Sequence, residues 1–371
     1  MLIPNLIRAI ERINKANSRQ QTVDRESKTV SSLPSTVYSL PPGDEEINRV
    51  VNELKLTGTG IEGTKKILNF YKFGVPVKFE KEKVVKYVQL FDFEEIENNE
   101  FIITRQAYYH GRDRIRTDII LYVNGIPLVN IECKSPVSIS ESWFNAFKQI
   151  KDYEKTVPEL YKYVQIGVAA ESKAKYFTIV PWQEEIKIHE WREDGKDSID
   201  STIVMLSKDI FLDVIKNFLF FRIERGESTK VITRYMQYGA ANKMVNRVID
   251  NINVGAGFKP APTKNKGLIW HWQGSGKTLT MIFAANKLYY EKKLENPTIF
   301  FIVDRIELED QLYKEFYSLD LVKPEIIGSV LELKELLKFD DYRGKRGVSI
   351  ILIHSSDLRS SGSFRKNSKR Y

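Results

Sequence analysis

The chain has 371 residues, of which 42% are hydrophobic and 12% aromatic, so it can bury the cores of two or three domains. Its formal net charge of +8 permits a polyanionic partner such as nucleic acid, although a solvated lysine-rich surface explains the same charge. The single cysteine excludes a disulfide framework and cysteine-rich metal sites, and it indicates a reducing, cytoplasmic location. No run approaches the about 18 apolar residues of a membrane span, so no membrane association is expected.

The first predicted elements are a short amphipathic helix at Met1–Arg19 and a flexible linker. Residues 18–43 are rich in Ser, Thr, Pro and Gln, a composition with little reason to pack. A helix is expected at Asp44–Leu56, and strand and turn signals follow it. We therefore place the helix and linker in residues 1–43 and a first α/β domain in residues 44–225.

A β-hairpin is predicted within residues 116–134. Asn124-Gly125 is the preferred dipeptide of a tight hairpin turn, and β-branched and aromatic residues flank it on both sides. Period-two alternation puts Glu132 and Lys134 on one face of the second strand. The same alternation predicts that Cys133 points to the opposite face and is buried there.

The register of this hairpin decides whether its acidic residues meet. A plain two-residue turn sets Asp118 opposite Ile131, one residue short of Glu132. A β-bulge in either strand would bring the two acids onto one face. Pro127 cannot donate a hydrogen bond to a neighbouring strand, so a disruption of the pairing is expected beside it.

The functional interpretation of this hairpin is a magnesium-dependent nuclease site. Oxygen atoms of Asp118 and Glu132 would hold Mg²⁺, which polarises a phosphodiester and lowers the pKa of a bound water. Lys134 would stabilise developing negative charge or orient the attacking water. The alternative is an exposed cross-strand ion pair, and the pattern alone does not exclude it.

A helix at Glu141–Lys155, with Ser138 and Glu141 spaced as a capping box, follows the hairpin. Gln149 and Tyr153 are four residues apart on it and share a face, which could turn polar groups toward a nucleic-acid backbone. An ordinary polar edge of a helix explains the same pair. Two short strands and a closing helix complete the first domain, at Tyr163–Ala169, Tyr176–Val180 and Asp209–Glu224.

The second domain is predicted around a phosphate-binding loop. An apolar strand starting at Gly267 feeds the hexapeptide Gln273-Gly274-Ser275-Gly276-Lys277-Thr278, which opens a helix. The glycines let backbone N–H groups approach the phosphates of a nucleotide such as ATP, Lys277 would reach the β- and γ-phosphates, and the Thr278 hydroxyl would ligate Mg²⁺. His271 stands where the loop ordinarily has its first glycine, so a chance glycine-rich turn is the alternative.

Strands and helices alternate around this loop, which predicts a parallel sheet in residues 226–354. The Ser-rich basic stretch at residues 355–371 is expected to be a disordered tail, and Val254–Thr263 is expected to be a flexible loop. The predicted elements are helices at Thr233–Asn251, Thr278–Tyr290 and Glu307–Tyr317 and strands at Thr298–Asp304 and Ser349–His354.

Taken together, these motifs resemble the restriction (R, motor-nuclease) subunit of type I restriction-modification enzymes. The order is diagnostic, because a hairpin nuclease of the PD-(D/E)xK kind precedes a superfamily 2 translocase motor. The resemblance runs from about residue 44 to about residue 312. The matching segments are 88–93, 99–106, 116–118, 124–129, 132–134, 149–153, 234–238, 271–278 and 303–311.

The resemblance implies an α/β fold, in which a PD-(D/E)xK nuclease domain is followed by an incomplete RecA-like P-loop domain with a parallel sheet. It implies an ATP- and Mg²⁺-dependent enzyme that cleaves double-stranded DNA after translocation. The implied partners are the DNA methyltransferase (modification) and specificity subunits of the same system. The resemblance also implies a role for Gln237, which lies in a segment where the family uses a glutamine to read adenine.

The sequence departs from the family pattern after the phosphate-binding loop. No Walker B acid pair on an apolar strand, second RecA-like lobe or arginine finger is found, so the chain is expected to be truncated before Walker B and unable to hydrolyse ATP. Two other interpretations stay open. One is an inactive remnant that only binds DNA or partner subunits, and the other is a stand-alone helicase-nuclease of DNA repair or defence.

Overall fold

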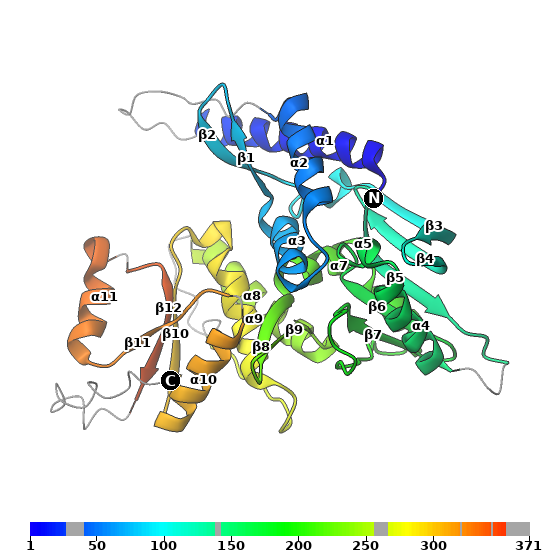
Figure 1. Cartoon of the computed structure of the whole chain (residues 1–371). Helices are drawn as coiled ribbons and strands as arrows, with labels where there is room; N and C mark the ends of the chain where they lie inside the picture. Colours follow the sequence, from blue (N-terminus) through cyan, green and yellow to red (C-terminus); the bar gives the residue numbers. More distant parts are fainter. Residues whose placement is uncertain (27–40, 138–141, 256–265, 320, 343, 354–371) are drawn as a thin grey trace. The chain divides into compact units, whose positions relative to one another are not determined.

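The computed structural model describes residues 1–26, 41–137, 142–255, 266–319, 321–342 and 344–353 (Figure 1). The chain forms two compact units. The first unit comprises Met1–Leu219 and Thr229–Ile232, and the second comprises Phe220–Ser228 and Thr233–Tyr371. The expected basic tail and residues 256–263 of the expected loop lie outside the described residues. The loop prediction is wrong at Val254 and Gly255, which belong to a helix that continues to Gly255. None of the helices in the described part of the chain combines the length and apolar character needed to span a bilayer.

The first unit begins with α1 (Ile3–Glu26), α2 (Asp44–Leu56) and α3 (Ile61–Phe73). α1 continues to Glu26, so the linker expected from residue 18 is wrong over its first turns. α2 has the predicted bounds, because Gly43 caps it and Glu46 bonds back to the Gly43 N–H at 3.0 Å. The apolar stripe of α1 is fully buried and consists of Leu6, Ala9, Ile10 and Ile13. Because this stripe packs in the core of the first unit, α1 is part of that unit.

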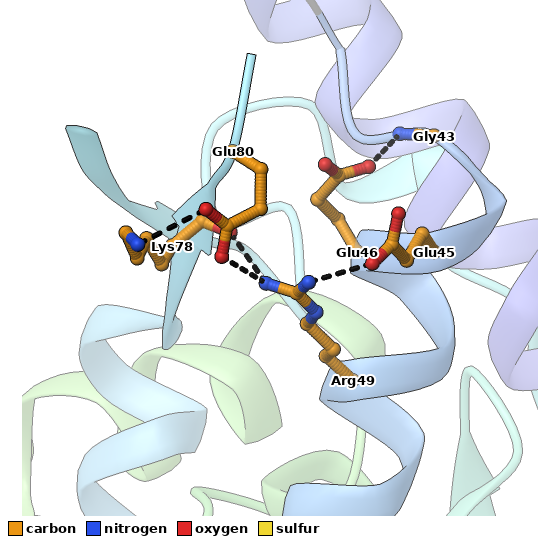
Figure 2. Close-up of polar contacts among 6 residues, drawn as sticks. All are labelled: Gly43, Glu45, Glu46, Arg49, Lys78 and Glu80. Carbon is orange, nitrogen blue, oxygen red and sulfur yellow. Dashed lines mark hydrogen bonds and ion pairs between the residues drawn. The ribbon is translucent and has the colours of Figure 1, made fainter. Parts of the chain in front are cut away.

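The hairpin of β1 (Val75–Phe79) and β2 (Val84–Val88) is joined to α2 by a network of exposed ion pairs (Figure 2). Arg49 contacts Glu45 at 2.6 Å and Glu80 at 3.3 Å. Exposed pairs of this kind are largely screened by solvent, so they orient the hairpin and add little stability.

The five-stranded sheet at the centre of the first unit has the order β3-β4-β5-β6-β7. Its neighbours pair antiparallel, except that β5 and β6 run parallel. The parallel pair requires a crossover, and that crossover contains the helix α4 described below. The strands are β3 (Phe101–His110), β4 (Arg114–Val123), β5 (Ile126–Cys133), β6 (Ile166–Ala170) and β7 (Ala174–Thr178).

The helix α4 (Trp143–Thr156) packs on β5 and β6, and α5 (Pro158–Tyr161) follows it (Figure 1). The Ser142 hydroxyl caps α4 by accepting the Phe144 N–H at 3.2 Å, and the predicted cap at residues 138 and 141 lies outside the described residues. Buried apolar residues of α4, α5 and the sheet form one core. Its members include Ile115, Ala146, Phe147, Ile150, Leu160, Val164, Ala169 and Phe177.

The closing helix predicted at Asp209–Glu224 is wrong in its second half. The chain forms α7 (Lys208–Asn217) and then the hairpin of β8 (Leu219–Glu224) and β9 (Glu227–Ile232). The turn has positive φ at Arg225 and Gly226, 54° and 82°, as a tight hairpin turn requires. Residues 220–228 of this hairpin belong to the second unit. The shorter elements of the first unit are η1 (Ile96–Asn98) and α6 (Ser198–Met205).

The second unit contains a three-stranded parallel sheet in the order β10-β12-β11. The parallel pairing confirms the sequence prediction. The strand expected before the phosphate-binding loop is not formed, and Leu268 and Trp270 are 94% and 79% exposed. The elements are α8 (Tyr235–Gly255), α9 (Lys277–Tyr289), η2 (Lys292–Leu294), β10 (Thr298–Val303), α10 (Ile306–Ser318), β11 (Glu325–Ile327), α11 (Val330–Tyr342) and β12 (Gly347–Leu352).

Candidate active sites

The predicted β-bulge is present in the hairpin of β4 and β5. The register of the two strands shifts by one residue and leaves Leu128 without an opposite partner, beside Pro127. With this extra residue in β5, Asp118 lies beside Glu132 and not opposite Ile131. The bulge therefore brings the two acids together, as the nuclease interpretation requires.

Two hydrogen bonds lock the acid pair to the backbone of the opposite strand. The Asp118 N–H donates to Glu132 Oε1 at 3.2 Å, and the Cys133 N–H donates to Asp118 Oδ2 at 2.9 Å. Each carboxylate therefore binds the strand that carries the other one. The arrangement fixes the positions of both carboxyl groups with no help from a flexible loop.

Glu132 is a buried acid with an unsatisfied oxygen. Its side chain is 0% exposed, and Oε2 has no hydrogen-bond partner among the described residues. Burial first, and then the charge of neighbouring Asp118, raises the pKa of Glu132 to about 8. A buried acceptor without a donor is costly, and a proton or a cation removes that cost.

The prediction that Cys133 is buried is wrong. Cys133 is exposed, whereas Glu132 and the other even-numbered residues of this strand end lie on the side covered by α4. The alternation of the strand is as predicted, but the packed face is the one that carries the acid. The backbone N–H of Cys133 takes part in the site through its bond to Asp118.

Lys134, Gln149 and Tyr153 form a hydrogen-bonded chain beside the acid pair. Lys134 Nζ donates to Gln149 Oε1 at 2.7 Å, and Gln149 Nε2 donates to the Tyr153 hydroxyl at 2.6 Å. The Tyr153 hydroxyl donates in turn to the carbonyl of Arg116 at 2.9 Å. Partial burial raises the pKa of Tyr153, so its hydroxyl stays protonated and able to donate.

The packing of α4 places this chain. Ala146, Phe147 and Ile150 turn one face of the helix into the core, so Gln149 and Tyr153 lie at the border of that face. Through these bonds the helix connects Lys134, which follows β5, to the first residues of β4. The prediction that the two residues share a helical face holds, and their contact with Lys134 is an observation of the tertiary structure.

Asn130 and Tyr161 belong to the same neighbourhood, and the sequence interpretation missed them. Both are fully buried, and Asn130 Nδ2 donates to the Tyr161 hydroxyl at 2.6 Å. Asn130 stands two residues before Glu132 and so shares its strand face. The sequence signal for Asn130 was its position two residues before Glu132, which places a polar side chain on the same strand face as the acid.

The side chains of this site could supply some, but not all, of the ligands of a hard divalent cation. Asp118 and Glu132 offer carboxylate oxygens, which Mg²⁺ prefers, and one of these oxygens is buried without a partner. The described ranges contain no group of three or more His, Cys, Asp and Glu residues that could hold a metal. Water or substrate oxygens would therefore complete the coordination of a cation.

The phosphate-binding loop in the second unit is a turn that leads into α9. Gly274 and Gly276 have φ of 78° and 82°, a region that other residues rarely adopt. Gly276 caps α9, which opens with Lys277 and Thr278. The Lys277 side chain is exposed and forms no hydrogen bond or ion pair with other described residues.

Gln237 lies directly against this loop. Its Nε2 donates to the carbonyls of Ser275 and Gly276, both at 3.3 Å, and its Oε1 accepts the Arg234 N–H at 2.9 Å. A Cβ at Gly276 would lie 2.4 Å from this Nε2, so the contact also requires glycine there. The predicted contact of Gln237 with adenine stays a prediction, as do the roles of Gln273 and Thr278.

Comparison with known proteins decides the family. A family model described as the type I restriction enzyme R protein N terminus matches residues 1–186, half of the 371-residue chain. The chain belongs to the type I restriction enzyme R proteins. A second model, the SWI2/SNF2 ATPase, matches residues 236–369 of this R protein chain.

Relatives of this R protein chain come from archaea and bacteria. It is 33% identical to a candidate type I restriction enzyme MjaVIIIP endonuclease subunit of Methanocaldococcus jannaschii, over 85% of the chain and 31% of that relative. It is 32% identical to the type I restriction enzyme HindI endonuclease subunit of Haemophilus influenzae, over 74% of the chain and 28% of the relative. The chain thus spans about three tenths of the length of these curated relatives.

Proposed function

We propose that the first unit is the DNA-cleaving part of a type I restriction endonuclease and that it cuts double-stranded DNA with Mg²⁺ as cofactor. The observation that carries the proposal is the buried, unsatisfied carboxylate of Glu132 beside Asp118. A cation bound to these oxygens would supply Lewis acidity and a more acidic bound water. Family membership and relatives named as endonuclease subunits support the same activity.

Each polar side chain of the site has a proposed role. Asp118 and Glu132 would hold the cation, and their bonds to the opposite strand keep them in place. Lys134 would stabilise negative charge that develops on the phosphate, because Gln149 holds its ammonium group and leaves two N–H donors for a ligand. Tyr153 would keep Gln149 oriented through its hydroxyl.

We propose that the second unit binds ATP at the Gln273–Thr278 loop. The N–H groups of the first turn of α9 and the unengaged ammonium group of Lys277 would contact phosphates, and Thr278 would contact Mg²⁺. The match to SWI2/SNF2 ATPases supports this assignment. In a full-length R protein we propose that ATP drives DNA translocation, with modification and specificity subunits as partners and the cytoplasm as location.

Cleavage of supercoiled plasmid DNA by the purified chain, with and without Mg²⁺, tests the nuclease proposal. Glu132→Gln and Asp118→Asn should each reduce cleavage to the level of a buffer blank. Lys81→Gln is the matched control, because Lys81 is exposed and lies outside the site. Cleavage that persists in both acid variants would refute the proposed site. Isothermal titration with Mg²⁺ adds a second readout, and heat of binding should be lost in Glu132→Gln.

A further inference from the structure

The hairpin of β3 and β4 carries positive charge that neither proposed site uses. Its arginines at positions 105, 112, 114 and 116 are exposed. None of the four guanidinium groups forms an ion pair within the described part of the chain. Asp113 is the acidic residue at the tip, and its Oδ1 accepts the Arg114 N–H at 2.7 Å, which shapes the turn.

The tip of this hairpin is fixed against the helix that carries Gln149 and Tyr153. The Arg112 N–H donates to the carbonyl of Thr156, at the end of α4, at 2.9 Å. A Cβ at Gly111 would lie 2.3 Å from the same carbonyl oxygen, so the approach requires a glycine. The positions of the arginines are therefore set relative to the acid pair.

One of these guanidinium groups is also held by an aromatic ring. The Arg114 guanidinium lies 3.9 Å from the centroid of the Tyr108 ring, a cation–π contact. Stacking in this way orients the guanidinium while its N–H groups stay at the edge of the stack, available to an anion.

We propose that the β3–β4 hairpin binds backbone phosphates of duplex DNA next to the cleaved bond. Guanidinium groups bind phosphate in a bidentate manner, and unpaired ones do so without first breaking an ion pair. β3 has ten residues, so the hairpin is about 34 Å long, close to one helical turn of B-DNA. The inference rests on the proposed nuclease function, since it assigns the substrate contact of that site.

The test is duplex binding by the full chain with Arg112→Gln and Arg114→Gln combined. Arg105→Gln is a second variant, which leaves the tip and the Tyr108 contact intact. The matched control combines Lys81→Gln and Lys196→Gln, two exposed lysines elsewhere on the first unit. Fluorescence anisotropy would follow a labelled 30-base-pair duplex and a single strand of the same length, in EDTA, over a series of salt concentrations.

The arginine double variant should bind duplex about 10-fold more weakly than wild type. Its slope of log affinity against log salt should fall by about 2, since each phosphate contact contributes about 0.9. Arg105→Gln should lower the slope by about 1, and the lysine control should keep it. Equal losses in the arginine and lysine doubles would overturn the proposal, as would a loss on single strands as large as that on the duplex.

Failure of this inference and failure of the nuclease proposal give different results. If cleavage depends on Glu132 but the arginine and lysine doubles bind DNA alike, the hairpin inference fails alone. If cleavage does not depend on Glu132 but the arginine variants lose duplex binding selectively, the hairpin binds DNA and the proposed catalytic site is wrong.

Discussion

Glu132 shows how the environment of a single carboxyl group sets both chemistry and stability. Its neighbours hold the side chain inside the sheet, next to another acid, with one oxygen unsatisfied. Burial, and then the negative charge of Asp118, disfavour the ionised carboxylate, so the pKa of Glu132 lies at about 8. A substitution of Glu132 is therefore expected to change the folding stability of the protein as well as its activity.

Glu132→Gln should stabilise the metal-free protein at alkaline pH. Because the folded-state pKa is raised, the stability contributed by the protonated carboxyl is complete below about pH 4.5 and is lost as pH rises through about 8. The amide does not titrate, so the variant escapes this loss, which we expect to be on the order of 3 kcal/mol. Chemical denaturation of the wild type and the variant in EDTA at pH 5, 7 and 8.5 measures the difference in their free energies of unfolding. A difference that does not grow with pH would contradict the prediction.

Cys133 should be labelled by a thiol reagent in the folded protein, because its side chain is exposed. The labelling rate should rise with pH, because partial burial and the neighbouring acids raise the pKa of the thiol. Its contribution to the site comes from the backbone N–H that binds Asp118, so Cys133→Ala should keep Mg²⁺ binding within about 2-fold, since surface substitutions rarely cost more than about 0.5 kcal/mol. Spectrophotometric thiol titration and calorimetry test both points. Labelling that needs denaturant would show that the thiol is covered.

At the scale of elements, the tip of the β3–β4 hairpin is held against the end of α4 by the bond from the Arg112 N–H to the Thr156 carbonyl. Gly111→Ala should destabilise the first unit by about 1–3 kcal/mol, because the added methyl group meets the Thr156 carbonyl oxygen at 2.3 Å. Gly60→Ala is the control, since an added Cβ there meets no atom within 4 Å. Equal urea midpoints for the two variants would show that the tip is free to move.

The two candidate sites lie in different compact units of the chain, and this separation has a consequence for the whole molecule. Lys277→Ala should weaken binding of a fluorescent ATP analogue by about 10-fold or more, because the lysine is the charged group of the loop, and should leave Mg²⁺ binding by the first unit intact. Glu132→Gln should have the opposite pattern. If each variant lost both ATP-analogue binding and Mg²⁺ binding, the two sites would not be independent.

The sequence by itself determined the features that depend on neighbours along the chain. The bounds of α2, the tight turn at Asn124-Gly125 and the glycine-rich loop before Lys277 follow from capping, turn and glycine preferences of a few adjacent residues. The bulge beside Pro127 was predictable for the same reason, because a missing N–H disrupts pairing wherever the strand lies.

Only the tertiary structure decided which partner each segment finds. It buried Glu132 and exposed Cys133, because α4 covers one face of β5 and alternation does not say which face is covered. It turned Leu219–Glu224 from a predicted helix into a strand, because β9 supplies hydrogen bonds beyond the glycine turn. It joined Lys134 to Gln149, 15 residues apart. Burial and strand pairing are non-local, so short sequence patterns leave them open.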